Sequence, residues 1–167
     1  MQVAVDRLIE VRWTDEIHDE WIRSLATNVS AIPIERLQIT RRLMEAALPH
    51  AMVTGYERHI PSLNLPDPND RHVVAAGIAG GASVILTLNL KDFPARELRR
   101  HGLRRQTPDA FLADLYDRAP ELTLASLASA RRNLSKTRVS ASDFVDILRS
   151  QKLIQLAARA AEHIGDL

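Results

Sequence analysis

The chain has 167 residues, of which 46% are hydrophobic and 26% charged. This balance is typical of a folded globular protein and argues against a disordered tail or a membrane protein. The 22 Lys and Arg residues nearly cancel the 21 Asp and Glu residues, which excludes a broad basic surface for nucleic acid. Without cysteine, the chain can form neither disulfides nor thiolate zinc sites. We expect a cytoplasmic protein, because nothing in the sequence indicates a membrane span or requires an oxidising compartment.

The first half of the chain predicts two long helices, each preceded or followed by a short strand. Val11–Trp13 is a strand candidate, and Thr14 then caps a helix whose first turn holds two acids. Ile17, Trp21 and Leu25 recur at helical spacing and form its buried stripe. A second helix is predicted over Ile34–Leu48, with Pro49 ending it, and Ala51–Thr54 is the next strand candidate.

The middle of the chain alternates helix and strand. Asp70 stands at an N-cap position before an Ala-rich helix, and Gly80–Gly81 end that helix in the left-handed conformation. Val84–Thr87 is a short β-branched run that predicts a buried strand of a parallel sheet. Pro94 opens a short helix, and Leu103–Gln106 is one more strand candidate.

From Thr107 onward the pattern is helical throughout. Helices are predicted near 108–118, 121–134, 141–150 and 152–164. Helix alternating with strand before this tail predicts an α/β fold with a mostly parallel sheet. The tail's apolar residues, such as Leu153, Leu156 and Ala160, could pack on the chain's own core or on a second copy.

Acidic and amide side chains collect where strands give way to helices. Glu20 flanks the buried stripe of the first long helix, Asp67 and Asp70 precede the Ala-rich helix, and Asn89 and Asp92 follow the Val84–Thr87 strand. In open parallel sheets such loops meet at one edge. Their oxygens suit Mg²⁺ or Mn²⁺ better than zinc. Taken singly, each residue is better explained as a helix cap, an exposed charge or a turn former, and only their joint placement favours a site.

Other catalytic signatures are missing from the sequence. There is no phosphate-binding G-x-x-x-x-G-K-[ST] loop, no G-x-S-x-G nucleophile turn and no H-E-x-x-H zinc motif. The 6 histidines show no spacing typical of metal ligands. The acidic and amide residues are therefore the strongest candidates for chemistry.

Two stretches resemble PIN-domain proteins. They are Arg12–Trp21, which reads RWTDEIHDEW, and Asp67–Pro94, which reads DPNDRHVVAAGIAGGASVILTLNLKDFP. The resemblance covers about residues 1–115, so we expect a PIN-like α/β domain over 1–115 and a helical carboxyl-terminal extension over 116–167. It implies a parallel sheet flanked by helices.

The resemblance also implies a function. PIN-domain proteins cleave single-stranded RNA with Mg²⁺ or Mn²⁺ held by acidic residues, and many are toxins kept inactive by an antitoxin. Glu20 matches the second acid of the family and Asp70 the third, and both are expected metal ligands. Asn89 stands at the fourth acid position, where Asp92 is the expected substitute as catalytic and metal-binding residue. Thr87 matches the hydroxyl residue at the strand end.

The opening of the chain departs from the family. Met1–Trp13 resembles the middle of the family's first helix, so one strand and its metal-binding aspartate are expected to be missing, and the activity of this chain to be crippled. The main hypothesis is a metal-dependent endoribonuclease, the toxin of a toxin–antitoxin pair, whose partners are single-stranded RNA, an antitoxin and a second copy in a homodimer. The alternative is a catalytically inactive PIN-fold module that binds an antitoxin or itself.

Overall fold

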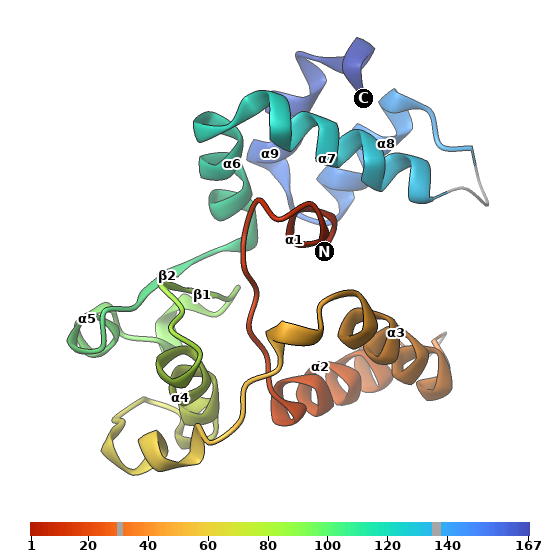
Figure 1. Cartoon of the computed structure of the whole chain (residues 1–167). Coiled ribbons are helices and arrows are strands. Elements are labelled where there is room, and N and C mark those ends of the chain that lie inside the picture. Colours follow the sequence, from red (N-terminus) through yellow and green to blue (C-terminus); the bar gives the residue numbers. More distant parts are fainter. Residues whose placement is uncertain (30–31, 135–137) are drawn as a thin grey trace. The chain divides into compact units, whose positions relative to one another are not determined.

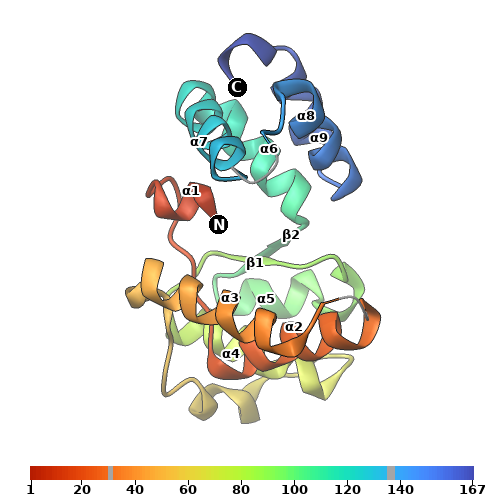
Figure 2. The same cartoon turned by 90° about the vertical axis from the view of Figure 1, so that its right-hand side faces the viewer.

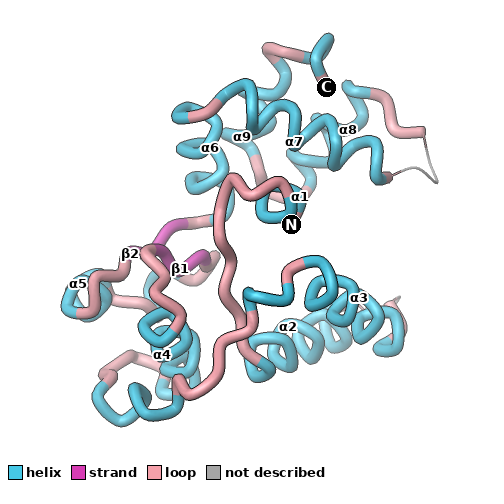
Figure 3. Tube along the Cα trace, viewed as in Figure 1, coloured by secondary structure: helices cyan, strands magenta, loops and turns pink. Residues whose placement is uncertain are grey.

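The computed structural model describes residues 1–29, 32–134 and 138–167. Most of the described chain is helical, with one pair of short strands (Figure 3). It divides into two compact units. The first unit comprises residues 1–9, 86–88 and 106–167, and the second comprises residues 10–85 and 89–105. The predicted domain boundary after residue 115 falls inside a helix, and it stays a prediction.

The second unit holds two long helices, two short ones and most of the strand pair. Its helices are α2 (Asp15–Asn28), α3 (Ile34–Ala47), α4 (Arg71–Ala79) and α5 (Ala95–Arg100). Helices α2 and α3 lie side by side (Figure 1), and α2 also contacts α4. Its core gathers apolar side chains from α4, α5, β1 and the loops around them, and Leu98, Val74 and Ala75 are fully buried.

The sheet is much smaller than the sequence predicts. Strand β1 (Val84–Leu86) pairs with β2 (Arg104–Gln106), the amide of Arg104 donating to the Ser83 carbonyl at 2.9 Å. The strands are parallel, and the connection between them passes through α5. Of the predicted buried strand, only Ile85 is buried. An α/β architecture is therefore present in a reduced form, and a PIN-like sheet is not confirmed.

Two predicted strands reduce to a single parallel bridge between Trp13 and Met52. The amide of Trp13 donates to the Ala51 carbonyl at 3.0 Å, and the amide of Val53 donates to Trp13 at 2.8 Å. Neither segment has room to extend, because Thr14 already caps α2 and a 3₁₀ turn over Pro49–Ala51 precedes Met52. The prediction of strands at Val11–Trp13 and Ala51–Thr54 was wrong in length for this reason.

The two glycines after α4 have different tasks. Gly81 takes a positive φ of 64°, as the predicted left-handed helix end requires. Gly80 has φ −83°, so the prediction for it was wrong. A Cβ at Gly80 would lie 2.9 Å from Cγ2 of Val53 and 3.0 Å from Cγ of Arg12. Gly80 is therefore needed because other segments approach its backbone closely.

The first unit is a cluster of helices. They are α1 (Gln2–Val5), α6 (Pro108–Arg118), α7 (Pro120–Asn133), α8 (Ala141–Ser150) and α9 (Ile154–Ala161). Figure 2 shows α6 to α9 grouped together, and α1 packs on α7. Leu156 and Ala160 are fully buried in this unit's own core. The apolar face of the tail therefore packs within the chain's own core, which was one of the two alternatives left open by the sequence.

A carboxylate of α6 caps α9. Oδ2 of Asp109 accepts from the amide of Gln155 at 3.0 Å, and Oδ1 accepts from the amide of Leu156 at 3.1 Å. These amides have no partner within α9, because they belong to its first turn.

Replacing Asp109 with alanine is expected to destabilise the first unit by about 1–2 kcal/mol, because a lost helix cap costs that much. The loss should appear as a lower urea midpoint measured by far-UV circular dichroism. Asp146→Ala is the control, since Asp146 is exposed and pairs only with Arg149 across one turn of α8. Equal losses in the two variants would contradict the capping role.

Candidate active site

Helix α2 begins as the sequence predicts. The Oγ1 of Thr14 accepts a hydrogen bond from the amide of Ile17 at 3.1 Å. The helix then carries acids at positions 15, 16, 19 and 20. Residues four apart lie on the same side of a helix, so these acids form two rows, Asp15 with Asp19 and Glu16 with Glu20.

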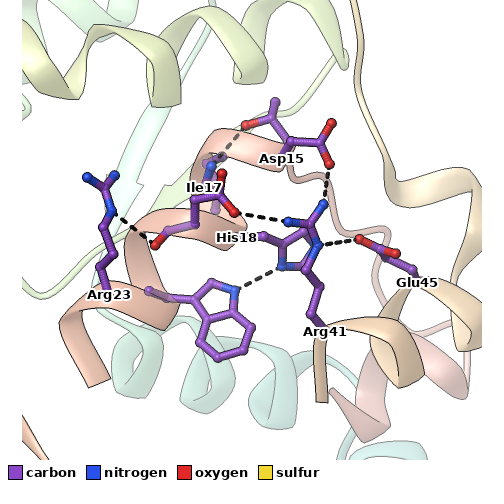
Figure 4. Close-up of polar contacts among 9 residues, drawn as sticks. Asp15, Ile17, His18, Arg23, Arg41 and Glu45 are labelled. Carbon is purple, nitrogen blue, oxygen red and sulfur yellow. Dashed lines mark hydrogen bonds and ion pairs between the residues drawn. The ribbon is translucent and has the colours of Figure 1, made fainter. Parts of the chain in front are cut away.

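The row of Asp15 and Asp19 faces α3. The guanidinium of Arg41 on α3 lies between Asp15 and Glu45 (Figure 4). Its Nε donates to Glu45 at 2.7 Å, and its Nη1 donates to Asp19 at 3.0 Å. Three carboxylates therefore share one guanidinium, which ties α2 to α3 and leaves the other acidic row free for a different role.

A buried histidine supports the same pair of helices. His18 is 1% exposed, and its Nδ1 accepts from the indole nitrogen of Trp21 at 2.9 Å. An Nδ1 that accepts carries no proton, so the ring is neutral and protonated on Nε2. Burial lowers the pKa of His18, and the nearby charge of Arg41 lowers it further. His18 is thus a structural residue. The buried residues of α2 are His18 and Ile22, whereas Ile17 and Trp21 are half-buried and Leu25 is 37% exposed, so the predicted stripe was wrong.

The row of Glu16 and Glu20 faces α4 through His72. Nε2 of His72 lies 3.4 Å from Oε2 of Glu20, and its Nδ1 lies 3.7 Å from Oε2 of Glu16. His72 is 7% exposed. The hydroxyl of Tyr56 donates to the same Glu16 oxygen at 3.1 Å. Glu20, the predicted second acid, is therefore held next to the start of α4.

Asp70 lies at the start of α4 but does not cap it. Its side chain makes no capping hydrogen bond, so this part of the prediction was wrong. The backbone of Asp70 is already helical, at φ −78° and ψ −6°, whereas a capping residue needs an extended backbone. Asp67 caps the preceding 3₁₀ turn instead, accepting from the amide of Asn69 at 2.8 Å. The Asp70 carboxylate is thereby available for other contacts.

The charges of the other acids reach Asp70. Burial raises the pKa of Asp70 above its ordinary value of 3.8, and the negative charges of Asp67, Asp92 and Glu20 raise it further. His72 acts in the opposite direction. Such coupling requires carboxylates that lie near one another. Three separate segments, α2, the start of α4 and the turn after β1, thus bring negative charge to one place.

The turn after β1 carries Asn89 and Asp92. Residues Leu90–Asp92 form a 3₁₀ turn, and Nδ2 of Asn89 donates to Oδ2 of Asp92. Asp92, the predicted substitute for the fourth acid, thus accepts a hydrogen bond from Asn89, the residue at the fourth acid position. Thr87, at the strand end, uses its amide to bond the Gln106 carbonyl at 3.0 Å.

The donor set suits a hard cation in its chemistry. Carboxylate oxygens are the ligands of Mg²⁺ and Mn²⁺, and Mg²⁺ often takes one or two protein carboxylates and keeps several waters. Within residues 1–29, 32–134 and 138–167, no three His, Asp or Glu side chains are placed so that they could hold one metal ion together. The roles of Glu20, Asp70, Asp92 and Asn89 as catalytic or metal-binding residues stay predictions.

Sequence reasoning did not single out Glu16, Tyr56 and His72. The signal for Glu16 was present, because it stands one helical turn before Glu20. His72 stands two residues after Asp70, but nothing in the sequence shows that α4 packs its histidine against α2. Tyr56 comes from a loop whose position only the folded chain decides.

Comparisons with known proteins find similarity over parts of the chain. Residues 108–162, which contain α6 to α9, match the family model of the VapC50 C-terminal domain. Over 75 residues the chain is 40% identical to a Mycobacterium tuberculosis (strain ATCC 25618 / H37Rv) protein named "Putative ribonuclease VapC50". The match covers 45% of this chain and 44% of that protein, so it spans less than half of either. No solved structure matches the chain.

The helices that the described residues form do not include one long and apolar enough to cross a membrane. The candidate acids all precede the segment matched by the family model.

Proposed function

We propose that this protein is a metal-dependent endoribonuclease of the PIN-domain type and the toxin of a toxin–antitoxin pair. The observation that carries the proposal is that Glu20 of α2 lies 3.4 Å from Nε2 of His72, two residues after Asp70 at the start of α4. The negative charges of Asp67, Asp92 and Glu20, which all raise the pKa of Asp70, support it. Carboxylates whose pKa is perturbed in this way are typical of functional sites. The similarity to a protein named as a ribonuclease supports the same reaction class.

The chemistry follows from the residues. Glu20, Asp70 and Asp92 would hold Mg²⁺ or Mn²⁺. A bound cation of this kind lowers the pKa of water and stabilises the negative charge that develops on a phosphate during hydrolysis. His72 keeps Glu20 turned toward the start of α4, and Arg41 keeps α2 itself in place.

The decisive experiment is a cleavage assay with the purified full chain. End-labelled single-stranded RNA, double-stranded RNA and single-stranded DNA are incubated with Mg²⁺, Mn²⁺ or EDTA. We expect cleavage of single-stranded RNA only, dependent on the cation and quenched by EDTA. Cleavage that persists in EDTA would contradict the role of the acids.

Metal preference gives an independent prediction. We expect Mn²⁺ to bind with a dissociation constant in the micromolar to millimolar range. Zn²⁺ should not bind more tightly than Mn²⁺ at a stoichiometric site, because only oxygen ligands are assigned to the metal. Titration calorimetry with each chloride salt measures both affinities. A stoichiometric Zn²⁺ site that survives dialysis, and that His72→Gln removes, would show that imidazole is a ligand and that the assignment is wrong.

A second candidate function is a catalytically inactive module that binds an antitoxin or a second copy of the chain. Asn89 at the fourth acid position favours it, as does the absence of a three-residue metal cluster from the described residues. The two functions differ in the cleavage assay. An inactive module forms a complex with the antitoxin encoded beside it but leaves every RNA intact at any cation concentration.

A further inference from the structure

The turn that carries Asn89 and Asp92 is weakly held by its own backbone. It is a 3₁₀ turn of three residues, Leu90–Asp92. Its two hydrogen bonds, from the amide of Asp92 to Asn89 and from the amide of Phe93 to Leu90, are both long at 3.3 Å. Phe93, next along the chain, is buried in the core of the second unit. The turn is thus anchored at its far end and loose along its length.

An arginine on β2 binds this turn by its main chain. Nη1 of Arg105 donates to the carbonyl oxygens of both Leu90 and Phe93, the second at 2.7 Å. Arg105 is itself held in the strand pair, because the amide of its neighbour Arg104 donates to the carbonyl of Ser83, the residue just before β1. Hydrogen bonds from a guanidinium are about twice as strong as those between neutral groups. One side chain thus closes both ends of the turn.

The strand period separates the two adjacent arginines. Side chains alternate between the faces of a strand. Arg104 is exposed, whereas Arg105 is half-buried and reaches the turn. The chain therefore offers an arginine at the turn and, next to it, a matched arginine whose side chain has no such contact.

We propose that Arg105 is a positioning residue of the candidate active site, which holds the Leu90–Phe93 turn so that Asp92 stays beside Asp70. The expected effect of Arg105 on catalysis rests on the proposed function. Its expected effect on the Leu90–Phe93 turn does not. Arg105 acts through Asp92 and does not touch the substrate.

The experiment compares Arg105→Gln, Arg105→Lys and the control Arg104→Gln in the full chain. Amide hydrogen exchange is followed by NMR at Asp92 and Phe93, whose amides close the turn. In Arg105→Gln we expect exchange there to accelerate by about tenfold or more, since a lost bond to a charged group has that weight. Arg104→Gln should exchange as the wild type does, and Arg105→Lys should restore part of the protection.

The kinetic readout separates positioning from general stability. In Arg105→Gln, kcat for RNA cleavage is expected to fall by about 10- to 100-fold with KM unchanged, because misplacement by about 1 Å has such effects. The amide of Thr87, bonded across the strand pair, should keep its protection. Loss of protection at Thr87 together with the turn would show a merely structural role and overturn the proposal.

The other possible outcomes also test the role of Arg105. Unchanged exchange at Asp92 and Phe93 in Arg105→Gln overturns the proposal, whatever the activity. If Arg105→Gln fails to fold, the same two amides in Arg105→Lys give the answer, because a lysine keeps the charge but forms fewer of the bonds. If the wild-type chain cleaves no RNA, the proposed function is contradicted. The hydrogen-exchange data at Asp92 and Phe93 then still test whether Arg105 holds the turn.

Discussion

Replacing Asp70 with asparagine is expected to abolish metal-dependent RNA cleavage and, at the same time, to make the protein more stable at neutral pH. Loss of activity should reach at least about 100-fold, because even residues that only orient metal ligands contribute 10- to 100-fold. The helix start should tolerate the change, since Asp70 makes no capping hydrogen bond.

The gain in stability follows from the direction of the pKa shift. The pKa of Asp70 is raised in the folded protein by burial and by its acidic neighbours. Its favourable contribution to stability is therefore present below the unfolded pKa of about 3.9 and is lost as the pH rises through the higher folded pKa. At pH 7 the wild type carries an unfavourable, partly buried negative charge that asparagine lacks.

Thermal unfolding in EDTA at pH 7 and at pH 3.5 measures this effect. We expect Asp70→Asn to melt above the wild type at pH 7 and close to it at pH 3.5, where Asp70 is largely protonated in both states. Asp146→Asn, an exposed carboxylate on α8, should match the wild type at pH 7. An Asp70→Asn variant that melts below the wild type at pH 7 would show that the carboxylate stabilises the fold.

Replacing Leu98 with alanine is expected to cost about 2–5 kcal/mol of unfolding free energy, the range for large-to-small changes in a packed core. Leu98 on α5 is fully buried in the core of the second unit. A chain of this size should then melt roughly 5–15 °C lower. Activity should fall with it, because α5 follows directly on the turn that carries Asp92.

Tryptophan fluorescence provides a local probe for this loss. Both tryptophans, Trp13 and Trp21, belong to the second unit, so the fluorescence transition reports on that unit. Leu43→Ala is the matched control, since Leu43 on α3 lies in the same unit and is 65% exposed, and it should shift the unfolding free energy by less than about 0.5 kcal/mol. Similar shifts in the two variants would mean that Leu98 is not a core residue.

Helices and their starts could be predicted from the sequence because their signals are local. Thr14, Thr107 and Ser140 each cap the helix that follows, by accepting from an amide three residues on. The spacing of Ile34, Leu37 and Met44 predicts α3 to within one residue of its end. A cap and a 3.6-residue period require no knowledge of distant segments.

Strand lengths could not be predicted in this way. An apolar run such as Ala51–Thr54 is compatible with a strand, but a strand exists only where a partner runs alongside it. Here the partner segment ends at Thr14, which turns into α2, so a single bridge is all that forms. The extent of the sheet was therefore a property of pairing, which is not local.

By itself the sequence determined which residue types could carry chemistry: oxygen ligands without sulfur, with Glu20 on α2, and acids before α4 and after β1. Only the tertiary structure decided how they are used. It assigned Asp15 and Asp19 to Arg41, placed His72 against Glu16 and Glu20, and bound the turn of Asp92 to Arg105. The reason is physical: a helix presents its acids at spacings set by its own geometry, whereas the charge that each acid meets comes from elements distant in the sequence.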